Sequence, residues 1–282
     1  MTTSKGRKSI FITGAASGMG RETARLFAKE GWFVGAFDVN DAGLLALQAE
    51  LGADNCLVRR LDVTDRADYG AALEAFSAAT GGALDLLFNN AGIGRGGPFD
   101  QMPFEDVIAV VNVNLMGVLI GIHAAAPLLK ATPGSLCFTT SSSSATYGMA
   151  GIAVYSATKH AVKGLTEALS VEFSAYGVRV ADTLPGLIDT PILPQGASAV
   201  APKDGMFRLI PPMEVAKAVW ASYHDTSADG GKLHWYVPPE LFELDKAATL
   251  APEALRERMK AEGGLFFMGQ SDLTSLAPAS SD

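Results

Sequence analysis

A tyrosine and a lysine one helical turn apart form the most reactive pattern in the chain. They are Tyr155 and Lys159, and a run of four serines, Ser141–Ser144, precedes them. Residues four positions apart lie on the same face of a helix, so the ammonium group can approach the phenol. A nearby positive charge favours the phenolate, and we expect it to lower the pKa of Tyr155 from its usual value of about 10. With a serine hydroxyl, this pair could move a proton to or from a carbonyl or a secondary alcohol.

A second pattern lies near the N-terminus. The apolar run Ser9–Thr13 leads into Gly14-Ala-Ala-Ser-Gly-Met-Gly20, and a helical stretch follows directly. Strand, glycine turn and helix are the context of a dinucleotide site, because glycines let the backbone approach a pyrophosphate and the helix start offers free N–H groups. The next apolar run, Phe33–Phe37, ends at Asp38, which is placed to accept hydrogen bonds from ribose hydroxyls. Its carboxylate would repel a 2′-phosphate, so the pattern favours NAD over NADP.

The elements that must position these groups alternate between strands and helices. We predict strands at 9–13, 33–37, 56–61, 84–88, 135–140, 178–184 and 232–237, and helices at 18–30, 41–51, 65–79, 104–130, 154–175 and 212–225. Continuous apolar strands joined through helices predict an α/β, doubly wound parallel sheet of about seven strands with helices on both faces. We expect a single domain. Residues 1–237 would form its dinucleotide-binding and catalytic part, with a substrate lid at about 191–211, and 238–282 a C-terminal helical extension and tail.

From about Ser9 to Pro191, the chain resembles the short-chain dehydrogenase/reductase family. The matching motifs occur in the family's order and spacing: Thr13-Gly14-x-x-x-Gly18-x-Gly20, Asn89-Asn-Ala-Gly92, Asn114, Ser142, Tyr155-x-x-x-Lys159 and Pro185-Gly186-x-x-x-Thr190. The resemblance implies a Rossmann-type fold and an NAD(P)-dependent alcohol dehydrogenase or ketone reductase. It also implies a homodimer or homotetramer, in which the helices at 104–130 and 154–175 pair between subunits.

The resemblance also gives each catalytic residue a role. Tyr155 would donate the proton to the substrate oxygen in reduction and accept it in oxidation. Lys159 would lower the pKa of Tyr155 and bind the nicotinamide ribose. Ser142 would polarise the carbonyl oxygen, and its two sequence neighbours are expected to point to the other face of an extended segment. Asn114 would anchor a water that links Lys159 to solvent.

The expected cofactor is NAD, with NADP less favoured. Residues expected to contact it are Gly14, Ser17, Gly18, Met19, Gly20, Asp38, Asp62, Val63, Asn90, Ala91, Gly92, Tyr155, Lys159, Pro185, Gly186, Ile188 and Thr190. The expected substrate is a mainly apolar, cyclic, aromatic or steroid-like alcohol or ketone, because the segments that should line its pocket carry few fixed charges. Its lining residues would be Ile93, Tyr147, Met149, Ile192, Leu193, Met206, Phe207 and Leu209. The alternative is that several of these residues simply hold the lid on the body.

Three other functions fit the sequence less well. A 3-oxoacyl (carrier-protein or CoA) reductase would favour NADPH and a basic docking surface, whereas Asp38 and a formal net charge of −8 oppose both. A non-catalytic dinucleotide-binding regulator of the same family usually lacks the tyrosine or the lysine, and this chain keeps both. A sugar-nucleotide epimerase would have a different glycine spacing and a larger C-terminal domain.

Composition limits the partners. The negative charge argues against nucleic acid or an anionic membrane surface. The apolar stretch Val107–Leu129 contains Asn112, Asn114 and His123, so we expect a helix buried on several sides and no membrane span. The two cysteines at 56 and 137 and the scattered histidines lack ligand spacing, which predicts no metal site and reduced, buried thiols in a cytoplasmic protein.

The C-terminal segment carries its own pattern. Helical stretches are predicted near Glu240–Leu250 and Pro252–Glu262, and Gly263-Gly264 would end the second one. The apolar cluster Leu265–Met268 is too hydrophobic for a solvated tail. We expect it to pack on the body of the protein or, alternatively, on the rim of the substrate cleft.

Overall fold

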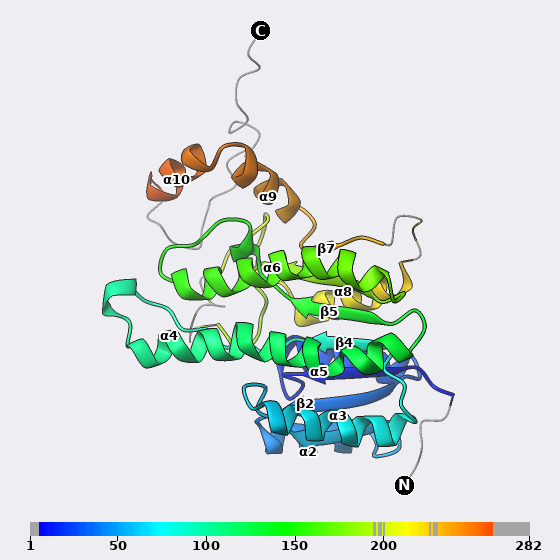
Figure 1. The fold of residues 1–282 in the computed structure, drawn as a ribbon. Coiled ribbons are helices and arrows are strands. Elements are labelled where there is room, and N and C mark those ends of the chain that lie inside the picture. Colours follow the sequence, from blue (N-terminus) through cyan, green and yellow to red (C-terminus); the bar gives the residue numbers. More distant parts are fainter. Residues whose placement is uncertain are drawn as a thin grey trace.

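A parallel β-sheet forms the centre of the protein (Figure 1). The computed structural model describes residues 6–193, 196, 199, 201–225, 227 and 231–261. The sheet has seven strands in the order β3-β2-β1-β4-β5-β6-β7: β1 Ser9–Thr13, β2 Phe33–Asp38, β3 Cys56–Arg60, β4 Leu86–Asn89, β5 Leu136–Thr140, β6 Arg179–Pro185 and β7 His234–Val237. The predicted doubly wound, Rossmann-type fold is confirmed. The strand order reverses between β1 and β4, where ligands bind in such sheets.

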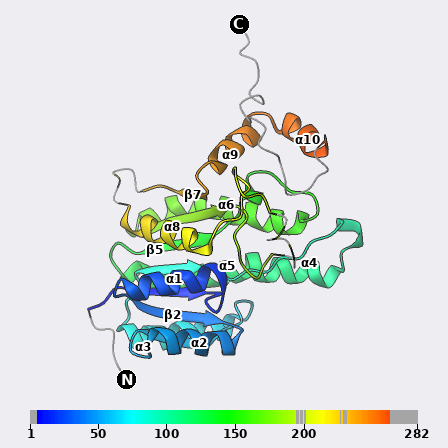
Figure 2. The same ribbon diagram turned by 180° about the vertical axis from the view of Figure 1, so that it is seen from behind.

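Helices cover both faces of the sheet (Figures 1 and 2). One face carries α1 (Gly18–Lys29), α2 (Asp41–Leu51) and α8 (Pro212–His224), and the other carries α3 (Arg66–Thr80), α5 (Gly117–Ala131) and α6 (Ala153–Ser174). Strand β1 shows why the core divides into two layers. Its side chains alternate, so Ile10 and Ile12 enter the first apolar cluster while Phe11 enters the second. All three are fully buried, as strands covered on both faces require.

The helix predicted at 104–130 differs from expectation in two ways. It consists of α4 (Phe104–Val111), a π-helical turn at Asn112–Met116 and then α5. By length and composition alone, this run could cross a membrane, and 33% of its most apolar window is buried. The expected burial on several sides was therefore correct for only part of the helix. Its outer apolar residues are exposed, among them Phe104, Ile108, Met116 and Leu119.

Two further helices, α9 (Leu241–Leu250) and α10 (Pro252–Ala261), follow β7 close to the predicted limits. They stand above the β7 edge of the sheet (Figures 1 and 2). Their buried residues, including Leu241, Leu244 and Leu255, form a third apolar cluster with Leu184 of β6. The predicted apolar cluster at 265–268 lies outside the described residues. The lid at 191–211 is described in part, and its Phe207 packs against this third cluster.

Candidate active site

The glycine turn between β1 and α1 forms a cradle that fits a pyrophosphate. Gly14 and Gly18 have φ angles of +67° and +52°, a conformation that disfavours other residues. A side chain on Gly20 would overlap the carbonyl oxygen of Gly14. Asn90, directly after β4, ties the turn in place, since its Nδ2 donates to the carbonyls of Thr13 (3.1 Å) and Gly14 (3.2 Å). The free N–H groups at the start of α1 suit a phosphate group.

Asp38 closes the adenine side of this cradle. Its Oδ2 accepts a hydrogen bond from Ala16 N at 3.0 Å, and its Oδ1 accepts one from Asn40 N at 2.9 Å. The carboxylate is therefore fixed against the glycine turn at the end of β2. Arg21 is the nearby cation in the first turn of α1, and its guanidinium pairs with Glu50 at 3.4 Å. The charge beside the ribose position is thus negative, which fits the diol of NAD better than a 2′-phosphate.

A cavity of about 390 Å³ extends along this cradle. Most of the predicted cofactor residues line it: Gly14, Ser17, Gly18, Met19, Asp38, Asp62, Val63, Asn90, Ala91, Gly92, Tyr155, Lys159 and Thr190. Gly20 does not line the cavity and instead lets α1 start close to the turn, while Pro185, Gly186 and Ile188 line a neighbouring cavity. The sequence reasoning missed Val39, Leu61, Val113 and Thr140. Hydrogen bonds from the hydroxyl and N–H of Thr64 lower the pKa of Asp62 and fix its carboxylate.

Lys159 and Tyr155 lie on the first turns of α6, as predicted. Lys159 is only 3% exposed, and its Nζ donates to the carbonyl of Thr140 at 2.7 Å. Burial lowers the pKa of Lys159 to about 8, and the negative charge of Asp182 opposes that shift. Its Nζ lies 5.5 Å from the centre of the Tyr155 ring.

The pKa of Tyr155 differs from the expected direction. Burial raises it, and a hydrogen bond with Ser142 opposes the rise. The physical reason is that a phenolate loses its hydration when it is buried, and the ammonium of Lys159 is already bonded to a carbonyl. Tyr155 is therefore neutral at pH 7 and can donate a proton.

The serines after β5 make different hydrogen bonds. The Oγ of Ser142 accepts from Ser144 N at 3.1 Å, and this bond begins a short 3-10 turn, Ser143–Ala145. Ser141 is fully buried and donates its hydroxyl to the carbonyl of Lys159 at 3.0 Å. The prediction that both neighbours of Ser142 point away was wrong for Ser143, which lines the same cavity as Ser142. The strand ends at Thr140, so the alternation of an extended chain does not reach that far.

Asn114 is fully buried in the π-helical turn. Its Oδ1 accepts from Ile93 N at 2.8 Å, and its Nδ2 donates to Ile93 O at 2.9 Å. The side chain thus holds the loop after β4. The extra residue of a π turn re-aims a side chain, and such turns are frequent at functional sites. The predicted water between Asn114 and Lys159 stays a prediction.

A second cavity, of about 480 Å³, opens beside Tyr155 and Ser142. Of the predicted substrate residues, Met149, Ile192, Leu193 and Phe207 line it, and Ile93 lines the first cavity. Tyr147, Met206 and Leu209 are not among its lining residues, and the first two pack against the third apolar cluster. The predicted substrate residues did not include Ile152, Leu187 and the charged Arg95, which also line this cavity. Residues shared by both cavities, including Met19, Thr140 and Tyr155, show that the cavities adjoin at the phenol.

Metal and thiol chemistry find little support in this geometry. Within the described ranges, no group of three or more His, Cys, Asp or Glu side chains could hold a metal ion. Cys56 and Cys137 are free and buried, and burial raises the pKa of both thiols to about 12. Both therefore stay protonated at neutral pH and are poor nucleophiles.

Comparison with known proteins agrees with this geometry. The family model described as short chain dehydrogenase matches residues 8–199. The chain belongs to this family. Cyclohexanol dehydrogenase from Acinetobacter sp. (strain SE19) is 35% identical over 216 residues, which cover 75% of this chain and 86% of that protein. The 2,5-dichloro-2,5-cyclohexadiene-1,4-diol dehydrogenase LinX from Sphingobium indicum is 40% identical over 188 residues, 66% of this chain and 74% of that protein.

Solved structures of other short-chain dehydrogenases are also similar. A short-chain dehydrogenase/reductase from Burkholderia phymatum in complex with NAD superposes with a TM-score of 0.74 at 25% identity, covering 94% of this chain and 98% of that one. The 3-ketoacyl-(acyl-carrier-protein) reductase from Brucella melitensis complexed with NADH has a TM-score of 0.73 at 30% identity, covering 83% and 98%. This chain is thus a short-chain dehydrogenase/reductase enzyme that uses a nicotinamide cofactor.

Proposed function

We propose that this short-chain dehydrogenase interconverts secondary alcohols and ketones of mainly apolar, cyclic, aromatic or steroid-like structure, with NAD(H) preferred. One observation carries the proposal. Tyr155 lies where the cavity lined by the glycine turn and Asp38 meets a second, more apolar cavity. A substrate oxygen beside Tyr155 and Ser142 would therefore lie next to the nicotinamide end of a bound dinucleotide.

Proton transfer falls to Tyr155. In reduction, its neutral phenol donates the proton to the substrate oxygen, and the hydroxyl of Ser142 stabilises the developing alkoxide. In oxidation, the same phenol must first lose its proton, and the ammonium of Lys159 favours that ionised form. A nicotinamide cofactor supplies or accepts the hydride when bound. Thr140 holds Lys159 in place through its carbonyl oxygen.

Asp38 supports the preference for NAD. The carboxylate is fixed by Ala16 N and Asn40 N, so it has little freedom to turn away from a 2′-phosphate. Arg21, which could receive such a phosphate, pairs with Glu50. Two structural relatives hold NAD or NADH and a third holds 5-hydroxy-NADP, so the preference rests on Asp38 and not on these neighbours.

The substrate class rests on the second cavity. Its apolar lining includes Met149, Ile152, Leu187 and Phe207, and Arg95 is its charged member. Arg95 is paired with Asp106 at 3.3 Å and is half exposed, so the cavity interior stays apolar. Such cavities bind by burying apolar surface. Two relatives named for cyclic substrates, a cyclohexanol dehydrogenase and a cyclohexadienediol dehydrogenase, favour a ring-shaped substrate here too.

A substrate screen tests the proposal. Cyclic, aromatic and steroid alcohols would be offered with NAD and with NADP, and kcat/KM measured by absorbance of the reduced cofactor. We expect the highest kcat/KM for an apolar ring alcohol with NAD. Turnover restricted to small charged hydroxy acids would contradict the substrate class, and a clear preference for NADP would contradict the cofactor.

A 3-oxoacyl reductase is the second candidate, since one structural relative is a 3-ketoacyl-(acyl-carrier-protein) reductase. Such an enzyme must accept a long thioester delivered by an acidic carrier protein. The net charge of −8 disfavours an acidic partner. Asp38 does not separate the two candidates, because that relative holds NADH. A β-ketoacyl thioester in the same screen distinguishes the two, because it should react poorly if the first proposal holds.

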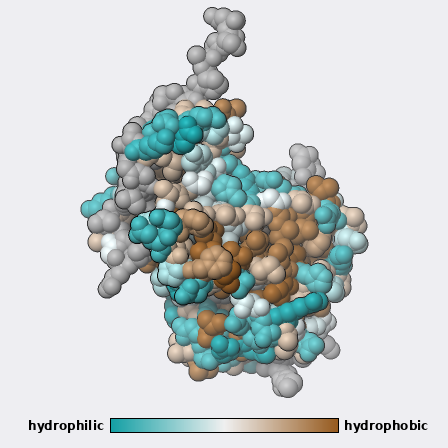
Figure 3. Space-filling view, turned by 60° about the vertical axis from the view of Figure 1, so that its left-hand side comes forward, coloured by the Kyte–Doolittle hydropathy of each residue, from teal (hydrophilic) through white to brown (hydrophobic). Residues whose placement is uncertain are grey.

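We also infer a homodimer or homotetramer that buries the outer face of α4, α5 and α6. Exposed apolar residues gather there, including Phe104, Ile108 and Leu119 on the first two helices and Val171 on α6. The space-filling view shows a broad apolar area at mid-height (Figure 3). Patches of this kind mark interfaces in soluble proteins. Light scattering of Leu119→Asp should show smaller particles than the wild type, and a monomeric wild type would contradict the inference.

A further inference from the structure

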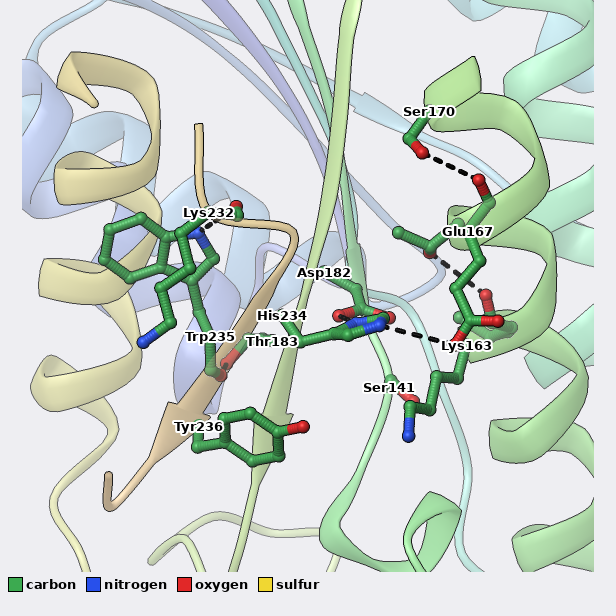
Figure 4. A network of polar contacts seen from close by, with 12 residues as sticks. Ser141, Lys163, Glu167, Ser170, Asp182, Thr183, Lys232, His234, Trp235 and Tyr236 are labelled. Carbon is green, nitrogen blue, oxygen red and sulfur yellow. Dashed lines mark hydrogen bonds and ion pairs between the residues drawn. The ribbon is translucent and has the colours of Figure 1, made fainter. Parts of the chain in front are cut away.

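A series of charged side chains fills the space between α6 and strands β6 and β7 (Figure 4). Asp182 on β6 has no exposed surface, and its Oδ1 lies 2.7 Å from Nδ1 of His234 on β7. The other ring nitrogen, Nε2, lies 3.4 Å from Oε1 of Glu167 on α6. The side chain of Glu167 is 52% exposed, so the series runs from a fully buried carboxylate to the protein surface.

The buried end of this series lies close to the catalytic lysine. Lys159 Nζ is bonded to the carbonyl of Thr140, and Thr140 pairs with Thr183, the residue directly after Asp182. Ser141, directly after β5, bonds to both β6 and α6. Its N–H donates to Thr183 O at 2.8 Å, and its hydroxyl donates to Lys159 O. The negative charge of Asp182 raises the pKa of Lys159 against the effect of burial.

A second ion pair, between Lys163 and Asp245, lies in the same space. Lys163, one turn after Lys159 on α6, forms an ion pair with Asp245 of α9 at 2.8 Å. Tyr236 of β7 donates its hydroxyl to the same Asp245 carboxylate at 2.5 Å. Lys163 thus has its own carboxylate, whereas Nζ of Lys159 is bonded to a neutral carbonyl.

Packing alone does not explain an acid at position 182. Its Oδ2 is buried and lacks a hydrogen-bond partner within the part of the chain that the structure describes. The Thr166 hydroxyl and the charge of Lys163 lower the pKa of Asp182, but they do not outweigh the effect of burial. A buried carboxylate with an unmatched oxygen is costly, and an apolar side chain would avoid that cost. A charge kept in such a place points to an electrostatic role.

We propose that Asp182 is a positioning residue of the active site, a buried counter-charge that His234 holds in place and that keeps Lys159 protonated beside Tyr155. The inference rests on the roles proposed above for Tyr155 and Lys159. The series Asp182, His234 and Glu167 thus connects the neighbourhood of Lys159 to the protein surface on the far side of α6.

The titration of His234 makes this counter-charge stronger in alkaline solution. Burial lowers the pKa of His234, but the hydrogen bond and negative charge of Asp182 outweigh it, so the net shift is upward. Burial raises the pKa of Asp182, and His234 opposes that rise. Below the pKa of His234, the imidazolium and the carboxylate cancel. Above it, the neutral imidazole still donates one hydrogen bond, and the carboxylate is left as a net negative charge that acts on both Lys159 and Lys163. The charge is therefore greatest in the pH range where Lys159 would lose its proton.

The test is the pH dependence of kcat/KM for ketone reduction, with the best ketone of the substrate screen. In this direction both the Tyr155 phenol and the Lys159 ammonium must keep their protons. Burial raises the pKa of Tyr155 and lowers that of Lys159 to about 8, so we expect the alkaline limb to report the loss of the Lys159 proton. Asp182→Asn should move that limb to lower pH by about one unit, the usual effect of removing an opposite charge at close range. His234→Phe should shift it in the same direction by a smaller amount. NADH affinity, measured by fluorescence over the same pH range, should begin to weaken at a lower pH in both variants than in the wild type, because Lys159 is proposed to bind the nicotinamide ribose.

Asp85→Asn is the matched control. Asp85 is also buried, at 7% exposure, and accepts from Ser9 N and Lys8, but it directly precedes β4 and so lies at the end of the sheet opposite the site. This variant should lower the melting temperature and leave both pH profiles unchanged.

Three outcomes would overturn the inference. One is an Asp182→Asn variant with wild-type pH profiles while Tyr155→Phe is inactive, in which case the proposed function stands. Another is a loss of rate by the same factor at every pH, as expected of a purely structural residue. If Asp182→Asn does not fold, an unshifted profile in His234→Phe has the same consequence. Wild-type turnover in Tyr155→Phe would instead contradict the proposed function itself.

Discussion

The two halves of the site are built in different ways. In the cofactor half, the glycine turn and Asp38 come from one continuous segment, β1, α1 and β2, and the ends of later strands add residues such as Asp62, Asn90 and Thr140. The substrate half is assembled from loops far apart in the chain, with Met149, Ile192 and Phe207 as examples. Behind these loops, the helices α9 and α10 complete a separate apolar cluster.

This difference shows which physical demands restrict residue types. A pyrophosphate cradle needs backbone at positive φ, which Gly14 and Gly18 provide, and close contact between turn and helix, which Gly20 permits. An apolar cavity needs volume and hydrophobicity, which many residues provide. The cofactor half is therefore recognisable in the sequence, whereas the substrate half depends on how distant loops meet.

Among changes that compare the two halves, the largest effect on binding should follow from breaking the cofactor half at Gly20. Gly20→Ala places a Cβ against the carbonyl oxygen of Gly14, so the turn or the helix must shift. We expect NADH affinity to fall at least tenfold, with stability reduced by about 1–3 kcal/mol. Isothermal calorimetry and thermal melting measure both. Gly70→Ala on α3, where an added Cβ meets nothing within 4 Å, is the control and should keep wild-type NADH affinity.

A smaller effect, on cofactor selectivity, should follow from removing the charge of Asp38 at the adenine end. Asp38→Asn keeps the side-chain shape but removes the charge that would repel a 2′-phosphate. We expect the ratio of kcat/KM for NAD to that for NADP to fall about tenfold, or about 1.4 kcal/mol. The exposed Asp41→Asn, at the start of α2, controls for loss of a nearby negative charge. An unchanged ratio in Asp38→Asn would show that another group selects the cofactor.

The smallest effect should come from the substrate half, where the loss of one side chain leaves many contacts. Phe207→Ala removes one apolar wall of the second cavity. KM for bulky ring alcohols should rise about fivefold, since a hydrophobic contact of this kind discriminates by about 1 kcal/mol. NADH affinity should not change. Phe242→Ala on α9, 52% exposed, should leave KM unaltered, and equal effects in the two variants would contradict this assignment of the cavity.

The contrast between the two halves also explains which strands and site residues the sequence predicts correctly. Every predicted strand is present with limits within about two residues, because buried parallel strands read as apolar runs between glycine turns and helices. The predicted Tyr155, Lys159 and Ser142 meet at one point because each sits at or near an element end that the sheet brings together. Asp38 was found for the same reason, at the end of β2.

The remaining features depend on long-range packing. The π turn at Asn114 interrupts a sequence that reads as one helix, and the Asn114 side chain on that turn bonds to Ile93, 21 residues earlier. The upward direction of the Tyr155 pKa depends on burial, which residue spacing does not reveal. The contact between Asp182 and His234 joins residues 52 positions apart. A polar residue inside the apolar run of β6 was the available signal for that contact.

The most direct test of the account is Tyr155→Phe, measured for turnover and NADH binding in the same preparation. The account predicts a loss of about 10²–10⁴-fold in kcat with the best ring alcohol, the range expected for a lost general acid or base. NADH affinity should remain within about twofold, because in the proposed mechanism the lost hydroxyl serves the substrate oxygen. A variant that keeps more than about a tenth of the wild-type kcat would contradict the central claim that the Tyr155 phenol carries the proton.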